Sequence, residues 1–431
     1  MPKMSPLLRH ILMAVVLVLA LFGLEVGFEL LVPDAAWRQL ALFAMVNVIV
    51  ALSLNIINGM AGQFSIGHAG FVGIGAYTGA VVAGNLHQRI GAEEVLFQNS
   101  FLVIPPALLA SGLMAAIFGL IVGLPSLRLR GDYLAIVTLG FAEIFRLVIA
   151  TAQTGGGVQG GLSKALASLG GQNGYAGPDN TGVPQYAGPF WIFGAVAVSI
   201  LFSWRLKFSG WGRALRALRE DEIAAASVGV DPTQYKVTSF VLAASGAGIA
   251  GGLLASMRDG SPTVQPDQFT FVTSFDAITM VILGGSGSVT GAIVGGILVT
   301  FTVKMIEQLQ GLESVQALRS AYPSLDLNAL RMVIYASVLI GLMILRPEGL
   351  FGERELIRRT SRGKAAKGGR AKEEPLPATT AAEAGATGAS GASEGEAALE
   401  GHAPPVARSP GEAGEKAEDA ALAESGKGEI K

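Results

Sequence analysis

About ten apolar runs, each long enough to cross a lipid bilayer, follow one another through most of this chain. A transmembrane helix needs roughly 20 consecutive apolar residues, and a helix satisfies every backbone polar group within its own segment, as hydrocarbon demands. The sequence therefore predicts an all-α integral membrane protein, a polytopic bundle of about ten transmembrane helices. The runs lie near residues 11–32, 38–57, 66–84, 101–125, 132–152, 189–206, 237–257, 270–284, 290–308 and 329–346.

The composition favours the same class of protein. Of the 431 residues, 51% are hydrophobic and the mean hydropathy is +0.50, which is too apolar for a soluble protein that must cover its core with charge. The 58 glycines suit a membrane bundle, because small residues let helices approach closely in lipid. The absence of cysteine excludes disulfides and thiolate chemistry. A net charge of −2 gives no case for nucleic acid as a partner.

Basic residues are distributed unevenly between the loops. The first apolar run follows basic residues as a signal peptide does, but its length exceeds a signal core, so we expect a retained span. With the N-terminus in the cytoplasm, ten spans place Arg128, Arg130, residues 205–236 and everything beyond Arg346 on the cytoplasmic side. This is the asymmetry that the positive-inside rule requires, so both termini are expected in the cytoplasm.

Several segments depart from the apolar pattern. Gly, Ser and Asn interrupt it at 59–70 and 270–291, where a broken or re-entrant helix is tolerated only if it is buried in protein. The loop at 153–188 is rich in Gly, Asn, Gln and Pro. It is long for a simple connection, and is either a flexible surface loop or a lip that meets an external substrate-delivering protein.

The C-terminal part has a different composition, dominated by Ala, Gly, Glu, Lys and Pro. Such a segment cannot bury enough apolar surface to offset its ordering entropy. We therefore expect an N-terminal span and connection over 1–37, a transmembrane domain over 38–352 and a disordered cytoplasmic tail over 353–431. The basic start of the tail, 354–372, suits contact with anionic lipid headgroups.

Residues 212–231 (GRALRALREDEIAAASVGVD) form a charged, helix-prone segment between two apolar runs. Arg213, Arg216 and Arg219 recur every three residues and predict one basic face, and residues 223–228 offer a small apolar contact surface. Gly229 ends the predicted amphipathic helix, since Pro232 forbids simple continuation. The helix either docks in a cleft of a partner protein or merely links two spans along the membrane surface.

The second informative segment is 58–79 (NGMAGQFSIGHAGFVGIGAYTG), in which glycine recurs every three or four residues. This spacing opens a groove on a helix face. Gln63, Ser65 and His68 lie where the groove begins, and polar groups at membrane depth face a cavity or a partner helix. No other His is spaced at i, i+3 or i+4 from His68, so the sequence predicts no metal site there.

Residues 62–69 (GQFSIGHA) resemble the GQ-x-S-x-GHA signature of the longer, M-type permease of high-affinity branched-chain amino acid importers. Further stretches are similar to this family in the expected order, and the likeness covers about 38–352. They are 131–140 (GDYLAIVTLG), the charged segment at 212–231, 281–285 (VILGG) with Gly287 and Gly291, and 346–350 (RPEGL).

The resemblance implies an ATP-binding-cassette (ABC) importer in a bacterial inner membrane. Its other members are a second homologous permease subunit, two ATPase subunits and an extracytoplasmic substrate-binding protein. The chain contains no G-x-x-x-x-G-K-[ST] loop, so ATP and Mg²⁺ are expected in the partner ATPases, with no cofactor and no catalysis in this chain. A G-x-G-x-x-G pattern at 246–251 lies inside an apolar run and indicates helix packing rather than a dinucleotide site.

The resemblance and the charge pattern of the sequence together indicate candidate residues. Those expected to couple to the ATPase are Arg213, Arg216, Arg219, Glu222, Ala224, Ala225 and Gly229. Those expected along the substrate path are Gln63, Ser65, Gly67, His68, Thr138 and Asp276. Family substrates are Leu, Ile and Val, and related permeases are associated with urea, short amides and aromatic acids, so the substrate stays open.

Charged residues inside the predicted spans keep an alternative open. Each charged side chain is costly to place in lipid, so it is expected to have a partner or a function. Glu143 and Arg146 are i, i+3 neighbours that can pair, and Asp132 is expected at the cytoplasmic interface, whereas Asp276 either meets a partner from another span or lines the path. An ion-driven secondary transporter would use Asp276 or Glu143, but it leaves the charged segment at 212–231 without a role. A membrane enzyme is disfavoured, because no HExxH or serine-elbow pattern occurs.

Overall fold

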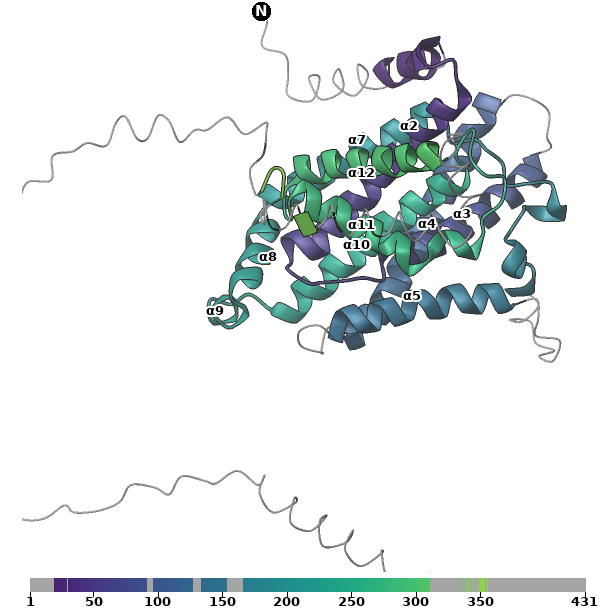
Figure 1. Ribbon diagram of the computed structural model, residues 1–431. Helices are drawn as coiled ribbons and strands as arrows, with labels where there is room; N and C mark the ends of the chain where they lie inside the picture. The colour runs from purple at the N-terminus through teal and green to yellow at the C-terminus, as the bar shows by residue number, and fades with distance from the viewer. Residues whose placement is uncertain are drawn as a thin grey trace, which may run out of the picture. The chain divides into compact units, whose positions relative to one another are not determined.

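The computed structural model describes residues 19–28, 30–90, 96–126, 133–152, 166–310, 349–352 and 355, with single positions at 333, 337, 340, 341 and 344. Six helices in these ranges are long and apolar enough to span a membrane, and three shorter apolar helices accompany them. The predicted all-α polytopic membrane bundle is confirmed (Figure 1). Nine of the ten apolar runs correspond to these helices, and the tenth, 329–346, lies largely outside the described residues.

The helices run in the following order. After a short apolar helix at Leu19–Phe28 come α2 (Ala35–Leu54), continued by the π-helix η1 (Asn55–Met60), α3 (His68–Ile90), α4 (Leu96–Ser126), α5 (Tyr133–Thr151), α7 (Pro189–Phe208), α8 (Gly210–Glu220), α9 (Glu222–Ser227), α10 (Pro232–Ala255), α11 (Phe271–Gly284) and α12 (Val289–Gln310). The two suspected interruptions are breaks in helix: the chain is not helical between Met60 and His68, nor between Gly284 and Val289.

Helix α10 packs directly against α3 and α4. A Cβ added to Gly251 would lie 2.0 Å from the carbonyl oxygen of Val72 in α3, and one added to Gly248 would lie 2.5 Å from that of Ser111 in α4. The glycines of the 246–251 pattern therefore serve close helix packing, as predicted.

The charged segment does not form one helix, which corrects the sequence prediction. It breaks at Asp221, whose backbone is extended (φ −153°, ψ 114°). The Asp221 carboxylate accepts hydrogen bonds from the backbone N–H groups of Ile223 and Ala224, at 2.8 and 2.9 Å. Since an aspartate in this position caps a helix N-terminus, Asp221 ends α8 and starts α9.

The described part of the long loop, 166–188, packs on the segment that follows α10. Backbone N–H groups of Tyr175, Val183 and Ala187 donate to carbonyls of Val264, Pro262 and Ser256 at 2.8 to 2.9 Å. These bonds fix one end of the bundle. The end that carries η1, α8 and the turn at 285–288 contains the site described next.

Candidate functional site

The polar residues of the GQFSIGHA signature join α3 to its neighbours. The Thr138 hydroxyl of α5 accepts hydrogen bonds from the backbone N–H groups of Ile66 and Gly67, at 3.2 and 3.3 Å. A Cβ on Gly67 would lie 1.8 Å from the carbonyl oxygen of Thr138. Only glycine lets the start of α3 approach α5 this closely.

His68 and Ala69 extend this connection to two further helices. The His68 ring is buried, and its Nε2 lies 2.8 Å from the hydroxyl of Ser53 in α2. The next backbone N–H, of Ala69, donates to the hydroxyl of Ser274 in α11 at 3.1 Å. The signature thus connects α2, α3, α5 and α11, and we call these hydrogen-bonded residues the signature cluster. The side chains of Gln63 and Ser65 are buried with no hydrogen-bond partner in the described part of the chain.

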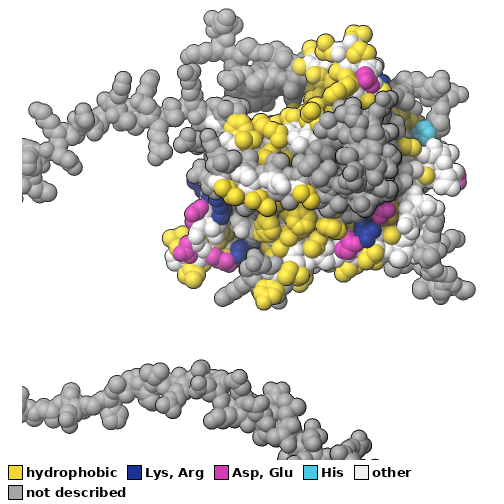
Figure 2. All heavy atoms as spheres, viewed as in Figure 1, with side chains coloured by type: hydrophobic (Ala, Val, Ile, Leu, Met, Phe, Trp, Pro, Cys, Tyr) yellow, Lys and Arg dark blue, Asp and Glu magenta, His cyan; other side chains and the backbone are white. Residues whose placement is uncertain are grey.

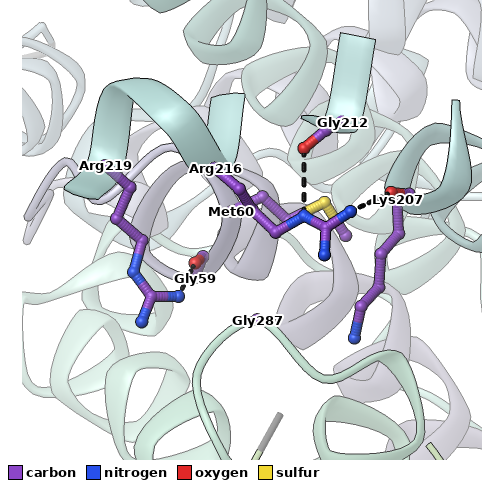
Figure 3. Close-up of a pocket in the computed structure, with 7 residues that line it drawn as sticks. All are labelled: Gly59, Met60, Lys207, Gly212, Arg216, Arg219 and Gly287. Carbon is purple, nitrogen blue, oxygen red and sulfur yellow. Dashed lines mark hydrogen bonds between the residues drawn. The ribbon is translucent and has the colours of Figure 1, made fainter. Parts of the chain in front are cut away.

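Helix α8 contacts the end of η1 through Arg219. The Arg219 guanidinium donates a 2.8 Å hydrogen bond from Nη1 to the carbonyl oxygen of Gly59 (Figure 3). Gly62, whose φ is +68°, lies under the same side chain, and a Cβ there would be 2.6 Å from Arg219 Cγ. The charged segment and the GQFSIGHA signature therefore meet at one contact, between Arg219 and Gly62, which are 157 residues apart in sequence.

The three arginines of α8 do not form one basic face, contrary to the sequence prediction. Arg213 is exposed, whereas Arg216 donates to the carbonyl oxygens of Gly212 and Lys207 at 3.3 and 3.4 Å. Figure 3 shows Arg216 and Arg219 lining one small pocket together with Lys207 and Gly287. A spacing of three residues rotates each successive side chain by about 60° around a helix, so the three residues divide between the body of the protein and solvent.

Helix α9 forms a projecting tip beyond α8 (Figure 1). Glu222 pairs with Lys236 of α10 at 2.6 Å, and Ala225 is buried while Ala224 is exposed. The side chains of Ile223 and Val228 are 85% and 78% exposed. Gly229 has a φ of +88°, a left-handed conformation that favours glycine and ends the tip. Figure 2 shows charged side chains gathered over this corner beside broad apolar surface.

A residue that the sequence prediction missed, Asn55, connects η1 to the turn at 285–288. Its side-chain oxygen accepts from the backbone N–H of Gly287 at 2.8 Å, and its amide nitrogen donates to the carbonyl of Ser288 at 3.1 Å. Asn55 is buried. The sequence signal that could have identified Asn55 is its polar amide side chain within an otherwise apolar run. We call the contact region of α8, η1 and this turn the helix-end joint.

A separate cavity of about 440 Å³ lies among α2, α3, α10, α11 and α12. Asp276 and Lys304 line it together with apolar side chains that include Phe43, Val46 and Met280. Of the six predicted path residues, Asp276 alone is among the described lining residues. Gly67, His68 and Thr138 belong instead to the signature cluster. This cluster lies close to the cavity, because Ala69, the residue after His68, lines it.

Of the remaining charged residues in the spans, Glu143 and Arg146 pair on one face of α5, as predicted, at 2.5 Å. Arg146 also contacts Asp267 at 3.2 Å. Asp132 lies outside the described residues. Among the described residues, no group of three or more His, Asp or Glu side chains is arranged to hold a metal ion.

Comparison with known proteins assigns the family. The family of branched-chain amino acid transport system permease components matches residues 37–345. The chain belongs to this permease family. The high-affinity branched-chain amino acid transport system permease protein LivM of Escherichia coli K12 is 34% identical over 350 residues, which cover 74% of this chain and 73% of that protein. This confirms the resemblance drawn from the motifs.

More distant relatives of this permease extend the comparison. The probable branched-chain amino acid transport permease protein LivM of Methanocaldococcus jannaschii is 27% identical over 337 residues, covering 72% of this chain and 91% of that protein. The permease protein LivH of the high-affinity branched-chain amino acid transport system of Salmonella typhimurium is 30% identical over 151 residues, 35% of this chain and 42% of that protein. No solved structure matches the chain.

Proposed function

We propose that this chain is a permease subunit of an ABC importer and that it forms part of the path for branched-chain amino acids. A second, LivH-like permease, two ATPase subunits and an extracytoplasmic binding protein complete the assembly. ATP and Mg²⁺ belong to the ATPases. The chain spans a bacterial inner membrane with both termini in the cytoplasm, the orientation favoured by its basic loops.

The observation that carries the proposal is the Arg219 contact. A helix that only linked two spans would need no direct hydrogen bond to a distant part of the bundle. Here the tip that projects from the bundle is joined through α8 and Arg219 to Gly59 at the end of α2. Such a contact lets binding energy released at a nucleotide site bias a membrane element between two states.

The cavity suits the proposed substrates. Its lining is largely apolar, and Asp276 and Lys304 are its acidic and basic members. An apolar wall favours the side chains of Leu, Ile and Val, since burying apolar surface is favourable by about 25 cal/mol per Å². The external binding protein supplies most of the selectivity in this proposal, and the path permits passage.

Reconstitution tests the proposal. The chain, its partner permease, the ATPases and the binding protein are placed in proteoliposomes, and entry of radiolabelled leucine is followed with ATP inside. We expect uptake that requires ATP and survives a protonophore. Uptake driven by an ion gradient without ATP would instead establish the secondary transporter, in which Asp276 is the first residue to examine.

A crosslink tests the docking surface separately. The chain has no native cysteine, so Ile223→Cys supplies a single thiol at an exposed position on α9. We expect it to capture an ABC ATPase, in a crosslink that changes when ATP is added. Thr181→Cys, exposed at the opposite end of the bundle, is the matched control and should capture none. Capture of an ATPase by both variants, or by the control alone, would refute α9 as the docking element.

A further inference from the structure

The end of the RPEGL motif and the residues after it lie against the helix-end joint. The backbone N–H groups of Leu350 and Phe351 donate to the carbonyl oxygens of Leu283 and Gly284, at 2.9 and 3.2 Å. Gly349 has a φ of +78°, and a Cβ there would lie 2.6 Å from the Cα of Gly285. A glycine is therefore needed for this segment to lie against the end of α11.

Glu355, which follows Gly352 by three residues, has a buried carboxylate. The side chains of Glu355 and Lys207 are 3% and 6% exposed, and Glu355 Oε1 lies 2.5 Å from Lys207 Nζ. The same carboxylate accepts from the backbone N–H groups of Val289 and Thr290, at 2.8 and 3.1 Å, and from the Thr290 hydroxyl at 2.9 Å. Glu355 thus binds the first turn of α12 and the last turn of α7 simultaneously.

The surroundings favour the ionised carboxylate. Burial alone raises the pKa of Glu355, but hydrogen bonds from Lys207, Val289 and Thr290 outweigh it and lower the pKa below its ordinary value. A carboxylate at a helix N-terminus also interacts favourably with the positive end of the helix dipole. Groups of the chain itself occupy the acceptor positions of the Glu355 carboxylate.

Glu355 closes a ring of contacts around the joint. Lys207 lies two residues before Ser209, whose hydroxyl caps α8 by accepting from Gly212 N–H at 3.2 Å. From α8 the ring passes through Arg219 to Gly59 in η1. Asn55 of η1 holds the turn at 285–288, which leads into α12. The Glu355 carboxylate joins α12 back to Lys207.

We propose that Glu355 is a positioning residue that makes α8 and the turn at 285–288 move as one body. This rests on the proposed function, since it assigns Glu355 a part in coupling. Without the carboxylate, Lys207 at the end of α7 loses its ion pair to the first turn of α12, and a displacement of the docking tip is absorbed at the junction of α7 and α8. ATP hydrolysis then continues while transport fails.

Glu355→Gln in the full reconstituted complex tests the proposal. The amide keeps the size of the side chain and removes the charge, so we expect leucine imported per ATP hydrolysed to fall at least tenfold, with ATPase turnover within about twofold of the native complex. Asp259→Asn removes one partner of the Arg38 ion pair at the opposite end of the bundle and should leave the ratio unchanged. An unchanged ratio in Glu355→Gln would overturn the proposal.

Two truncations check the assignment by a different route. A chain ending after Arg359 keeps Glu355 and removes the separate unit over 360–431, so its transport ratio should match the full chain. A chain ending after Gly352 removes Glu355 and should reproduce the loss. Equal transport ratios for the two truncations would also overturn the proposal.

A stability measurement separates failure of this inference from failure of the proposed function. Thermal unfolding of the solubilised chain is compared for Glu355→Gln, Lys207→Met and the double variant. We expect the double variant to lose less than the sum of the single losses, whatever the chain transports. Additive losses would show that the two residues are not paired, whereas coupled losses in a complex that lacks ATP-driven uptake would reject only the importer.

Discussion

Substitution of Gly67 by alanine tests whether the GQFSIGHA signature is a packing element. The added Cβ would lie 1.8 Å from the Thr138 carbonyl oxygen and 2.3 Å from its carbon, and real Cβ contacts do not fall below 3.0 Å. These are backbone atoms, so no rotamer change relieves the clash. The start of α3 must retreat from α5 by about 1 Å, at a typical overpacking cost of about 1–3 kcal/mol.

The same movement weakens two hydrogen bonds to the Thr138 hydroxyl, each worth roughly 1 kcal/mol. The total is on the order of 3 kcal/mol, which lowers the ratio of folded to unfolded protein by about a hundredfold. Gly140→Ala is the matched control, since a Cβ there has no neighbour within 4 Å. Thermal unfolding of the solubilised chain should show a clear loss for Gly67→Ala alone. Equal midpoints for the two variants would refute the packing argument.

Further predictions concern charge and backbone at the α9 tip and at Glu355. Glu222→Lys places a second cation beside Lys236 and should stop ATP-coupled uptake with little effect on stability, because an exposed ion pair contributes under about 1 kcal/mol; normal uptake would contradict the docking role. In Gly229→Leu the added Cβ meets no atom within 4 Å, but a residue with a side chain is forced into φ +88°, a strain of about 1–2 kcal/mol, so uptake should fall while the membrane level of the chain is kept. Because the pKa of Glu355 is lowered from 4.5, its stabilisation is complete above that pH and is lost as pH falls through the lowered pKa. The difference in thermal midpoint between the native chain and Glu355→Gln should therefore shrink below about pH 4.5; a difference that is the same at acidic and neutral pH would contradict this.

The sequence predicted the features that depend on local pattern. The lengths of the apolar runs located the spans, because the thickness of the hydrocarbon layer and the rise per residue of a helix fix the number of residues that a span needs. The glycines at 246–251 were correctly assigned to helix packing, since an uninterrupted apolar run cannot supply the strand of a dinucleotide fold. Gly229 was correctly placed at the end of the charged segment.

Contacts between distant segments were not predictable in the same way. Arg216 and Arg219 carry the same charge as Arg213, and nothing in their neighbours indicates which will face backbone carbonyls and which will face solvent. The break at Asp221 follows from a capping bond that competes with continued helix. Glu355 follows the RPEGL motif in a stretch whose composition predicts disorder, and nothing in that composition indicates its contacts with α12 and Lys207.

The joint is built from helix ends. A π-helix bonds each N–H to a carbonyl five residues earlier, and η1 ends with Ala61 N–H donating to the Ile56 carbonyl. Its last carbonyls have no partner within the helix, and Arg219 supplies a charged donor to that of Gly59, at the negative end of the helix dipole. Glu355 supplies the opposite charge at the positive end of α12. Because each charge satisfies backbone groups that would otherwise be buried without partners, neither contact can open without a cost of about 1–3 kcal/mol. The proposed coupling therefore requires that α8, α2 and α12 move together.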